Sequence, residues 1–361
     1  MNSPAEVRTG AQLLVDALCV HGVDTAFCVP GESYLAVLDA LYDVKEQIKL
    51  IVCRQEGGAA FMSDAYGKLT GKPGICFVTR GPGASNAAIG LHTAHQDSTP
   101  MILFIGQIGS DVAEREAFQE VDYRRMFGQM AKWVAQIDRA DRVTEMVSHA
   151  FHVAVSGRPG PVVLALPEDM LVASAPAVRV QRYQRTAANP GAKDLQKLRD
   201  MLATAERPLV ILGGGDWSPQ ACADMQVFAQ NFGLPMTCSF RRIDLFDNRH
   251  DHYVGEVGIV TSPELKKRVA QADLIVTIGA RLGEMTTAGY TLFQVPKPAV
   301  RFVHVHPGAE ELGRVYQADL MINSGMLEFA AALRQLPGIS SPKWTAWRKE
   351  ARAEYLQNIE P

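Results

Sequence analysis

The sequence predicts an α/β protein made of two doubly wound parallel-sheet domains. Its 361 residues correspond to about two domains at roughly 150 residues each. Over the first ~170 residues, continuous apolar runs alternate with helical segments, which is typical of a parallel sheet covered on both faces. The same alternation returns after residues 174–192, an aperiodic stretch containing Pro and Arg that predicts an interdomain linker.

In the first domain, residues 1–173, helices are predicted where apolar residues recur at helical spacing, and strands where short apolar runs end near Gly or Pro. Leu13, Leu14 and Leu18 show the helical spacing, and Gly22 predicts the helix stop. The predicted helices are 10–21, 34–43, 57–71, 83–96 and 142–157, and the predicted strands are 25–31, 48–53, 74–79, 100–106 and 161–167.

The second domain, residues 193–336, repeats this pattern, and a tail of residues 337–361 follows it. The tail reads as a loop and an amphipathic helix on which Trp344 and Trp347 share one face, so we expect them to pack. We interpret the tail as a linker toward a further domain. The predicted helices of the second domain are 194–205, 220–233 and 263–272, and its predicted strands are 208–215, 273–280 and 300–307.

The composition is that of a protein with ordinary hydrophobic cores: 47% of residues are hydrophobic, 21% are charged and the net charge is −3. No basic block indicates nucleic-acid binding, and no apolar run reaches the ~18 residues needed to span a membrane. The N-terminus has no secretory signal pattern. Cysteines without a C-x-x-C pair predict free thiols in a reducing compartment, so we expect a cytoplasmic protein. They are Cys19, Cys28, Cys53, Cys76, Cys222 and Cys238.

Two stretches of the first domain are candidate ligand sites. Glu56 lies between a predicted strand and a helix, where it is either a helix-start carboxylate or a buried acid that addresses a ligand. In "TRGPGASNAAIG", residues 79–90, a Gly-Pro-Gly turn precedes a helix with Ser85 and Asn86 near its start. The turn is either a plain tight turn or a place where a ligand approaches the backbone, and it does not match a P-loop.

Three further features carry weaker signals. The stretch "LGGGDWS", residues 212–218, is equally compatible with a packing turn and a phosphate cradle. His92 and His95 share a helix face, but no third metal ligand is evident. His304 and His306 alternate along a predicted strand, which favours a paired surface or cleft role over a metal site. We therefore predict no metal site within the chain.

A series of motifs appears in a fixed order along residues 6–335. It includes FCVPGE, RQEGGAAFMSDAYGKLTGKPG, VTRGPGASNAAIGL, AFQEVD, SGRPGPVVLALPED, RPLVILGGG and ADLIVTIGARLG. In this order they resemble the thiamine-diphosphate enzymes of the acetolactate synthase type. That family has a pyrimidine-binding, a central and a diphosphate-binding domain, and this chain resembles the first two. The Gly-Asp-Gly run that marks the third is not found, so the chain resembles the N-terminal two-thirds of such an enzyme.

The resemblance implies a catalytic role for Glu56. In the family, the matching Glu hydrogen-bonds the aminopyrimidine ring of thiamine diphosphate and shares a proton with it, which activates the cofactor. Pro30 and Gly31 match one loop that meets this ring, and Gly83 and Asn86 match a second. The ligands of the accompanying Mg2+ are expected in the diphosphate-binding domain.

The resemblance also implies a carboligase or decarboxylase that acts on 2-keto acids as a homodimer or homotetramer. Phe118 and Gln119 match the substrate-side pair of the family, and Lys132 matches a Lys near the pocket entrance. Two alternatives stay open: a decarboxylase of another 2-keto acid or of an acyl-CoA, and a non-catalytic nucleotide-binding fragment.

A bound FAD or ADP is the third implication, and here the sequence departs from the family. The residues that match contacts to such a nucleotide are Arg158, Gly213, Gly214 and Arg281. The usual HVDID motif, however, reads HVHPG, so that His306 and Gly308 replace two aspartates. Because those carboxylates help hold the ribose and adenine end, FAD, ADP and an empty site are all compatible with the sequence.

Overall fold

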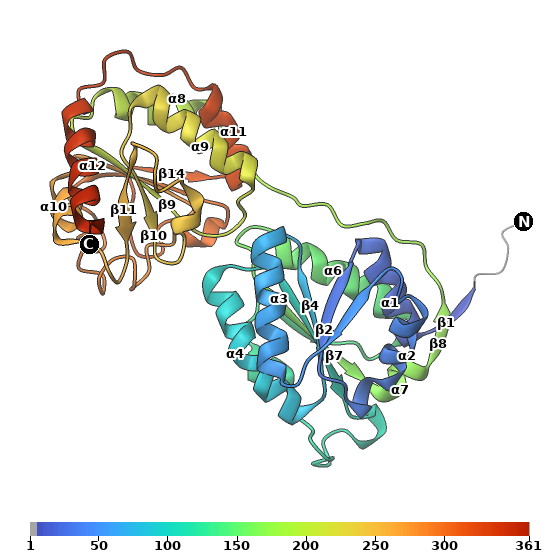
Figure 1. The fold of residues 1–361 in the computed structure, drawn as a ribbon. Helices are drawn as coiled ribbons and strands as arrows, with labels where there is room; N and C mark the ends of the chain where they lie inside the picture. Colours follow the sequence, from blue (N-terminus) through green and yellow to red (C-terminus); the bar gives the residue numbers. More distant parts are fainter. Residues whose placement is uncertain (1–5, 361) are drawn as a thin grey trace, which may run out of the picture. The chain divides into compact units, whose positions relative to one another are not determined.

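In a computed structural model, which describes residues 6–360, the chain folds into two compact units, one up to Thr186 and one from Ala187. Within the described residues, each unit is an α/β domain built on a six-stranded sheet whose strands all run parallel (Figure 1). The predicted fold class is confirmed.

The sheet of the first unit has the strand order β3-β2-β4-β5-β7-β6. Chain order reverses between β2 and β4, because β3 and β4 flank β2 on opposite sides. Helices α1, α2 and α6 pack on one face of the sheet, and α3, α4 and α5 on the other (Figure 1). The strands are β2 (Thr25–Cys28), β3 (Lys49–Val52), β4 (Gly74–Val78), β5 (Met101–Gln107), β6 (Trp133–Gln136) and β7 (Pro161–Pro167); the helices are α1 (Gly10–His21), α2 (Leu35–Asp43), α3 (Glu56–Thr70), α4 (Gly81–Asp97), α5 (Tyr123–Phe127), α6 (Val143–Val155) and α7 (Glu168–Val172).

Local sequence explains how these helices begin, end and pack. A capping box between Thr9 and Gln12 starts α1, and Gly22 ends it in the left-handed conformation, with φ of 76°, which confirms the predicted stop. Helices α3 and α4 approach closely at Gly90, where a Cβ atom would lie 2.5 Å from the Cβ of Ala60. Small residues on both helices make this contact possible.

The start of α4 differs from the prediction. The sequence suggested a turn at Gly81–Gly83 with the helix beginning near Ala84, whereas the helix begins at Gly81 and its first turn contains Pro82. Proline is well tolerated there because the first N–H groups of a helix have no partner within the helix. The two glycines are therefore helical residues, and their function lies in what they contact.

The start of the predicted linker belongs to the first unit. Val7–Thr9 (β1) pairs antiparallel with Ser174–Pro176 (β8). Further along, the backbone N–H of Tyr183 donates to Nδ1 of His21, at 3.1 Å. Residues 174–183 therefore follow the surface of this unit.

The sheet of the second unit has the strand order β11-β10-β9-β12-β13-β14, with the reversal between β9 and β12. Helices α8, α9 and α11 share one hydrophobic core with the sheet, and α10 and α12 contribute to the core on the other face. The strands are β9 (Pro208–Leu212), β10 (Met236–Ser239), β11 (Tyr253–Val257), β12 (Leu274–Ile278), β13 (Arg301–His306) and β14 (Leu320–Asn323); the helices are α8 (Ala192–Ala203), α9 (Pro219–Phe232), α10 (Pro263–Gln271), α11 (Met326–Gln335) and α12 (Thr345–Ile359).

The C-terminal tail is an integral part of the second unit. Trp344 and Trp347 are buried, as predicted, and the indole N–H of Trp347 donates to the carbonyl of Pro208, at 3.0 Å. Arg268 of α10 pairs with Glu354 of α12, at 2.7 Å, and stacks on the Trp347 ring. These contacts fix α12 against β11 and α10.

Candidate functional site

The carboxyl ends of β2, β3 and β4 surround the reversal of chain order in the first sheet. In open α/β sheets, ligands bind at such a point. Pro30 and Gly31 follow β2, Glu56 begins α3 after β3, and Gly81–Gly83 begin α4 after β4. The structure therefore brings these sequence-predicted residues to one edge of the first sheet.

Glu56 is the first residue of α3 and is half-buried. Its Oε2 accepts a hydrogen bond from Nδ2 of Asn86 on α4, at 2.9 Å, a bond that the sequence did not predict. Its Oε1 lies 3.6 Å from the position that a Cβ atom on Gly83 would take, and it makes no hydrogen bond with the residues described in the structure. One carboxylate oxygen is thus fixed by Asn86, and the other lies beside Gly83 without a hydrogen bond to the described residues.

Thr79, which the sequence analysis missed, holds the two glycine segments together between β4 and α4. A Cβ on Gly31 would lie 2.5 Å from its Cβ, and one on Gly83 would lie 2.9 Å from its Cγ2. Its Oγ1 shares a hydrogen bond of 2.8 Å with Oγ of Ser33. A larger residue at position 31 or 83 would push the segments apart.

The predicted substrate pair, Phe118 and Gln119, lies in a loop attached to the start of α4. The N–H of Gly81 donates to the carbonyl of Gln119, at 3.2 Å. Phe118 is 71% exposed, so its ring faces solvent in this chain. The loop therefore stands at the same edge as Glu56, with its aromatic side chain uncovered.

Arg80 cross-links three loops at this edge and was also missed. Its Nη2 lies 3.3 Å from Oε1 of Glu32, which follows β2, and 3.5 Å from Oε1 of Glu168, which follows β7. Its Nε is buried without a hydrogen-bond partner among the described residues. A charged residue two positions after a buried strand was the signal that could have identified it.

Lys132 lies at the opposite, amino edge of the same sheet. It directly precedes β6, and its Nζ donates to the carbonyls of Val153 and Ser156, both at 2.5 Å, at the end of α6. The unit does not bring this predicted substrate residue to Glu56.

Arg158 also lies at the amino edge, just before β7. Its Nε donates to Oγ of Ser98, at 2.8 Å, and its Nη2 donates to the carbonyl of His95 at the end of α4. A guanidinium is well placed at a helix C-terminus, where backbone carbonyls need donors. Among the described residues, no group of three His, Cys, Asp or Glu side chains could hold a metal ion.

The second unit gathers Gly213 and Gly214, after β9, and Arg281, after β12, at one edge of its sheet. His304 and His306 on β13 are both 2% exposed, so of the two roles expected for this pair the surface role is wrong, while the cleft role stays a prediction. Burial lowers the pKa of His304, whose Nε2 contacts the carbonyl of Ala280, at 2.9 Å.

The six cysteines are free thiols, as predicted. Burial raises the pKa of the Cys28 thiol to about 11 and raises that of Cys76 further. These thiols are therefore protonated near neutral pH and are poor nucleophiles. Within residues 6–360, no helix is long and apolar enough to cross a membrane.

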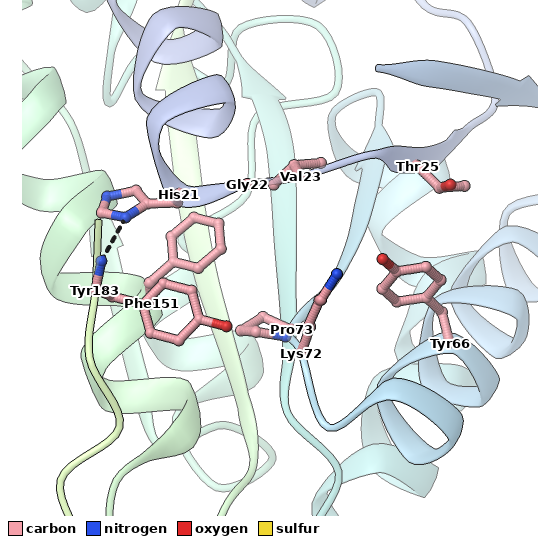
Figure 2. A pocket seen from close by; sticks show the side chains of 9 residues that line it. All are labelled: His21, Gly22, Val23, Thr25, Tyr66, Lys72, Pro73, Phe151 and Tyr183. Carbon is pink, nitrogen blue, oxygen red and sulfur yellow. Dashed lines mark hydrogen bonds between the residues drawn. The ribbon is translucent and has the colours of Figure 1, made fainter. Parts of the chain in front are cut away.

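A small cavity of about 10 Å³ lies where residue Tyr183 covers the end of α1 (Figure 2). It has room for about one water molecule. His21 and Phe151 form one wall, and Tyr66 and Lys72 contribute to the lining. No sequence-predicted site residue lines it, so it is no candidate for the ligand site.

Comparisons with known proteins match the same two regions. Residues 8–126 match the model "Thiamine pyrophosphate enzyme, N-terminal TPP binding domain", and residues 195–333 match "Thiamine pyrophosphate enzyme, central domain". The acetolactate synthase isozyme 2 large subunit of Escherichia coli is 32% identical over 330 residues, which is 90% of this chain and 59% of that protein. The acetolactate synthase large subunit of Parasynechococcus marenigrum is 32% identical over 96% of this chain and 57% of its own length.

Proposed function

Because this chain belongs to the thiamine pyrophosphate enzymes, of which it carries the N-terminal TPP binding domain and the central domain, we propose that it is part of an enzyme that uses thiamine diphosphate on 2-keto acids. The chain spans 59% and 57% of the length of the first two relatives. For the whole protein we favour carboligation of the acetolactate synthase type. Decarboxylation of another 2-keto acid or of an acyl-CoA is the alternative.

The observation that carries this proposal is the state of the Glu56 carboxylate. Asn86 orients it through Oε2, while Oε1 is available to a ligand beside Gly83. A carboxylate with one oxygen fixed and one available can hold or transfer a proton at a defined point.

The residues at this edge fit the aminopyrimidine ring of thiamine diphosphate. Gly31 and Gly83 present no side chain, and Thr79 keeps their two segments at contact distance. When bound, the cofactor supplies an electron sink for the bond-breaking step. Glu56 would hold the proton at Oε1, and Asn86 would keep the carboxylate oriented through its bond to Oε2.

The remaining parts of the active site are expected outside these 361 residues. We place the Mg2+ ligands and the diphosphate contacts in a diphosphate-binding domain of a neighbouring subunit, within a homodimer or homotetramer in the cytoplasm. Lys132, at the other edge of the sheet from Glu56, would then serve a site different from the one Glu56 builds. Of FAD, ADP and an empty site, the contacts of the second unit favour the empty site.

Glu56→Gln tests the proposal in the complete enzyme assayed with thiamine diphosphate, Mg2+ and a 2-keto acid. Gln keeps the shape and removes the acid, so turnover is expected to fall by about 10²–10⁴-fold with the fold intact. Glu46→Gln, a change at an exposed Glu between α2 and β3, is the matched control and should leave turnover unchanged. Near wild-type turnover of Glu56→Gln would disprove the assignment.

Calorimetry on residues 1–361 tests whether this chain binds the cofactor by itself or only as part of a larger enzyme. Thiamine diphosphate is held mainly through Mg2+ and its diphosphate, so no binding is expected at micromolar concentrations. A Mg2+-dependent isotherm would show that the chain supplies those contacts itself.

A further inference from the structure

The glycine turns that end β9 and β12 pack directly against each other. A Cβ on Gly214 would lie 2.0 Å from the carbonyl oxygen of Gly279, and a Cβ on Gly279 would lie 2.4 Å from that of Gly213. Gly214 and Gly279 have φ values of 71° and 78°, which few other residues adopt. Close contact between the two backbones therefore explains why both positions are glycine. The contact occupies the turn that a dinucleotide would have to approach.

The polar backbone groups of Gly213 are already used. Its N–H donates to the carbonyl of Ile278, at 3.0 Å, and its carbonyl accepts from Nε1 of Trp217, at 2.8 Å. A Cβ on Gly213 would lie 2.2 Å from Oγ of Ser239, so a side chain fills the space in front of it. No donor of Gly213 is left for a phosphate oxygen.

Arg281 faces a carboxylate that belongs to the protein. Its Nε lies 3.2 Å from Oε2 of Glu311, whose side chain is 3% exposed, and the other Glu311 oxygen lies 2.9 Å from Nη1 of Arg314. A buried carboxylate between two guanidinium groups neutralises the charge that a diphosphate would need. A diphosphate would have to displace Glu311 or lie beside its negative charge.

The residues at the position where a ribose would bind hydrogen-bond one another instead. His306 is 2% exposed, and its Nδ1 accepts a hydrogen bond from the N–H of Gly308, at 3.0 Å. Nδ2 of Asn323 donates to the carbonyl of His306, also at 3.0 Å. An imidazole occupied in this way cannot replace the acidic side chain that accepts from ribose hydroxyls in dinucleotide sites.

We propose that the central unit holds neither FAD nor ADP, because its own side chains and backbone close the edge at which a dinucleotide would bind. Glycine packing fills the turn, Glu311 neutralises Arg281, and His306 closes the loop at the ribose end. The unit then serves as a nucleotide-free structural domain. This inference does not depend on the role of Glu56, which lies in the other unit.

The test uses residues 1–361 purified without added nucleotide. The protein is expected to be colourless, to release no ADP on denaturation, and to give no heat of binding with FAD or ADP, which corresponds to a Kd weaker than about 1 mM. A flavin absorbance band, a stoichiometric release of ADP, or a Kd tighter than about 100 µM for either nucleotide would overturn the proposal.

A double variant tests whether the loss of the two aspartates of the family motif, at positions 306 and 308, is enough by itself to prevent nucleotide binding. His306→Asp with Gly308→Asp restores both carboxylates, and a Cβ at position 308 would meet only the flexible end of Glu310, at 2.4 Å. The variant is expected to melt as a folded protein and still to bind neither nucleotide, since Gly214 and Arg281 are unchanged. FAD or ADP binding by this variant would refute closure by the glycine turn and Glu311.

Discussion

His21 makes the stability of the first unit dependent on pH. Its ring is 1% exposed, stacks on Phe151 with 4.5 Å between centroids, and accepts at Nδ1 the N–H of Tyr183 (Figure 2). Since Nδ1 accepts, Nε2 carries the proton and donates to Oγ of Ser148, at 2.9 Å. A second proton would break the bond that holds Tyr183.

The size of the effect follows from the pKa of His21. Burial, with smaller contributions from the charges of His152 and Arg182, lowers it from 6.5 to about 4. An unfolded chain binds a proton at His21 once the pH falls below 6.5, whereas the folded chain resists until about pH 4. The contribution of neutral His21 to the free energy of unfolding is therefore complete above pH 6.5. It falls as the pH drops toward 4, by about 3 kcal/mol at about 1.4 kcal/mol per pH unit.

Urea unfolding between neutral pH and about pH 4 measures this loss, with fluorescence of Trp133, the only tryptophan of the first unit, as the probe. In His21→Asn, the amide oxygen can accept from Tyr183 but does not titrate. This variant should lose less stability than wild type over the same range. The reasoning is refuted if both proteins show the same pH dependence, or if the Tyr183 amide keeps the same protection factor against hydrogen exchange at both ends of the range.

Substitutions at three further positions test packing and the candidate site. Gly90→Ala is expected to destabilise the first unit by about 1–3 kcal/mol in urea, because its methyl group would lie 2.5 Å from the Cβ of Ala60; unchanged stability contradicts this close approach. Trp347→Ala should destabilise the second unit by about 3–5 kcal/mol, and Trp347→Phe by only about 1 kcal/mol through the lost bond to Pro208, so equal losses would refute the packing argument. Asn86→Ala, at an exposed position, should leave thermal stability unchanged while turnover of the complete enzyme falls about 10- to 100-fold; full activity would show that Asn86 does not orient Glu56.

The sequence predicts the fold best where a strand is buried on both faces. Every residue of β4, β5, β7, β9 and β12 is buried, and each strand stands out as a continuous apolar run. The short strands β6, β10 and β14 were not predicted, because each has four residues and includes polar ones. Pairing with a neighbouring strand makes these segments extended, and a local pattern does not contain that information. Helix α11 does show helical spacing of apolar residues and could have been predicted.

Strand β6, which was not predicted, determines the edge of the sheet at which Lys132 lies. Lys132 was predicted to lie near the pocket entrance by resemblance alone. It directly precedes β6, and a residue before a parallel strand lies at the amino edge of the sheet. Arg158 precedes the predicted strand β7, so the same argument was available for it. Glu56 follows its strand and was placed correctly at the carboxyl edge, whereas its bond to Asn86 joins residues 30 positions apart and needed the fold.

The two units show why a glycine after a parallel strand does not identify a ligand site by itself. Both sheets reverse their chain order next to such glycines, at Gly83 in the first unit and Gly214 in the second. A Cβ on Gly83 would lie 2.9 Å from Cγ2 of Thr79, so this glycine is also required by packing, but Oε1 of Glu56, 3.6 Å from the same point, has no hydrogen bond to the described residues. Opposite Gly214 lies the backbone of Gly279, so the missing side chain is filled by the protein itself. Both glycines therefore make packing contacts, and the candidate site is marked by a polar atom beside the glycine that has no hydrogen bond to the described residues. In the first unit that atom belongs to Glu56, which follows a different strand from Gly83.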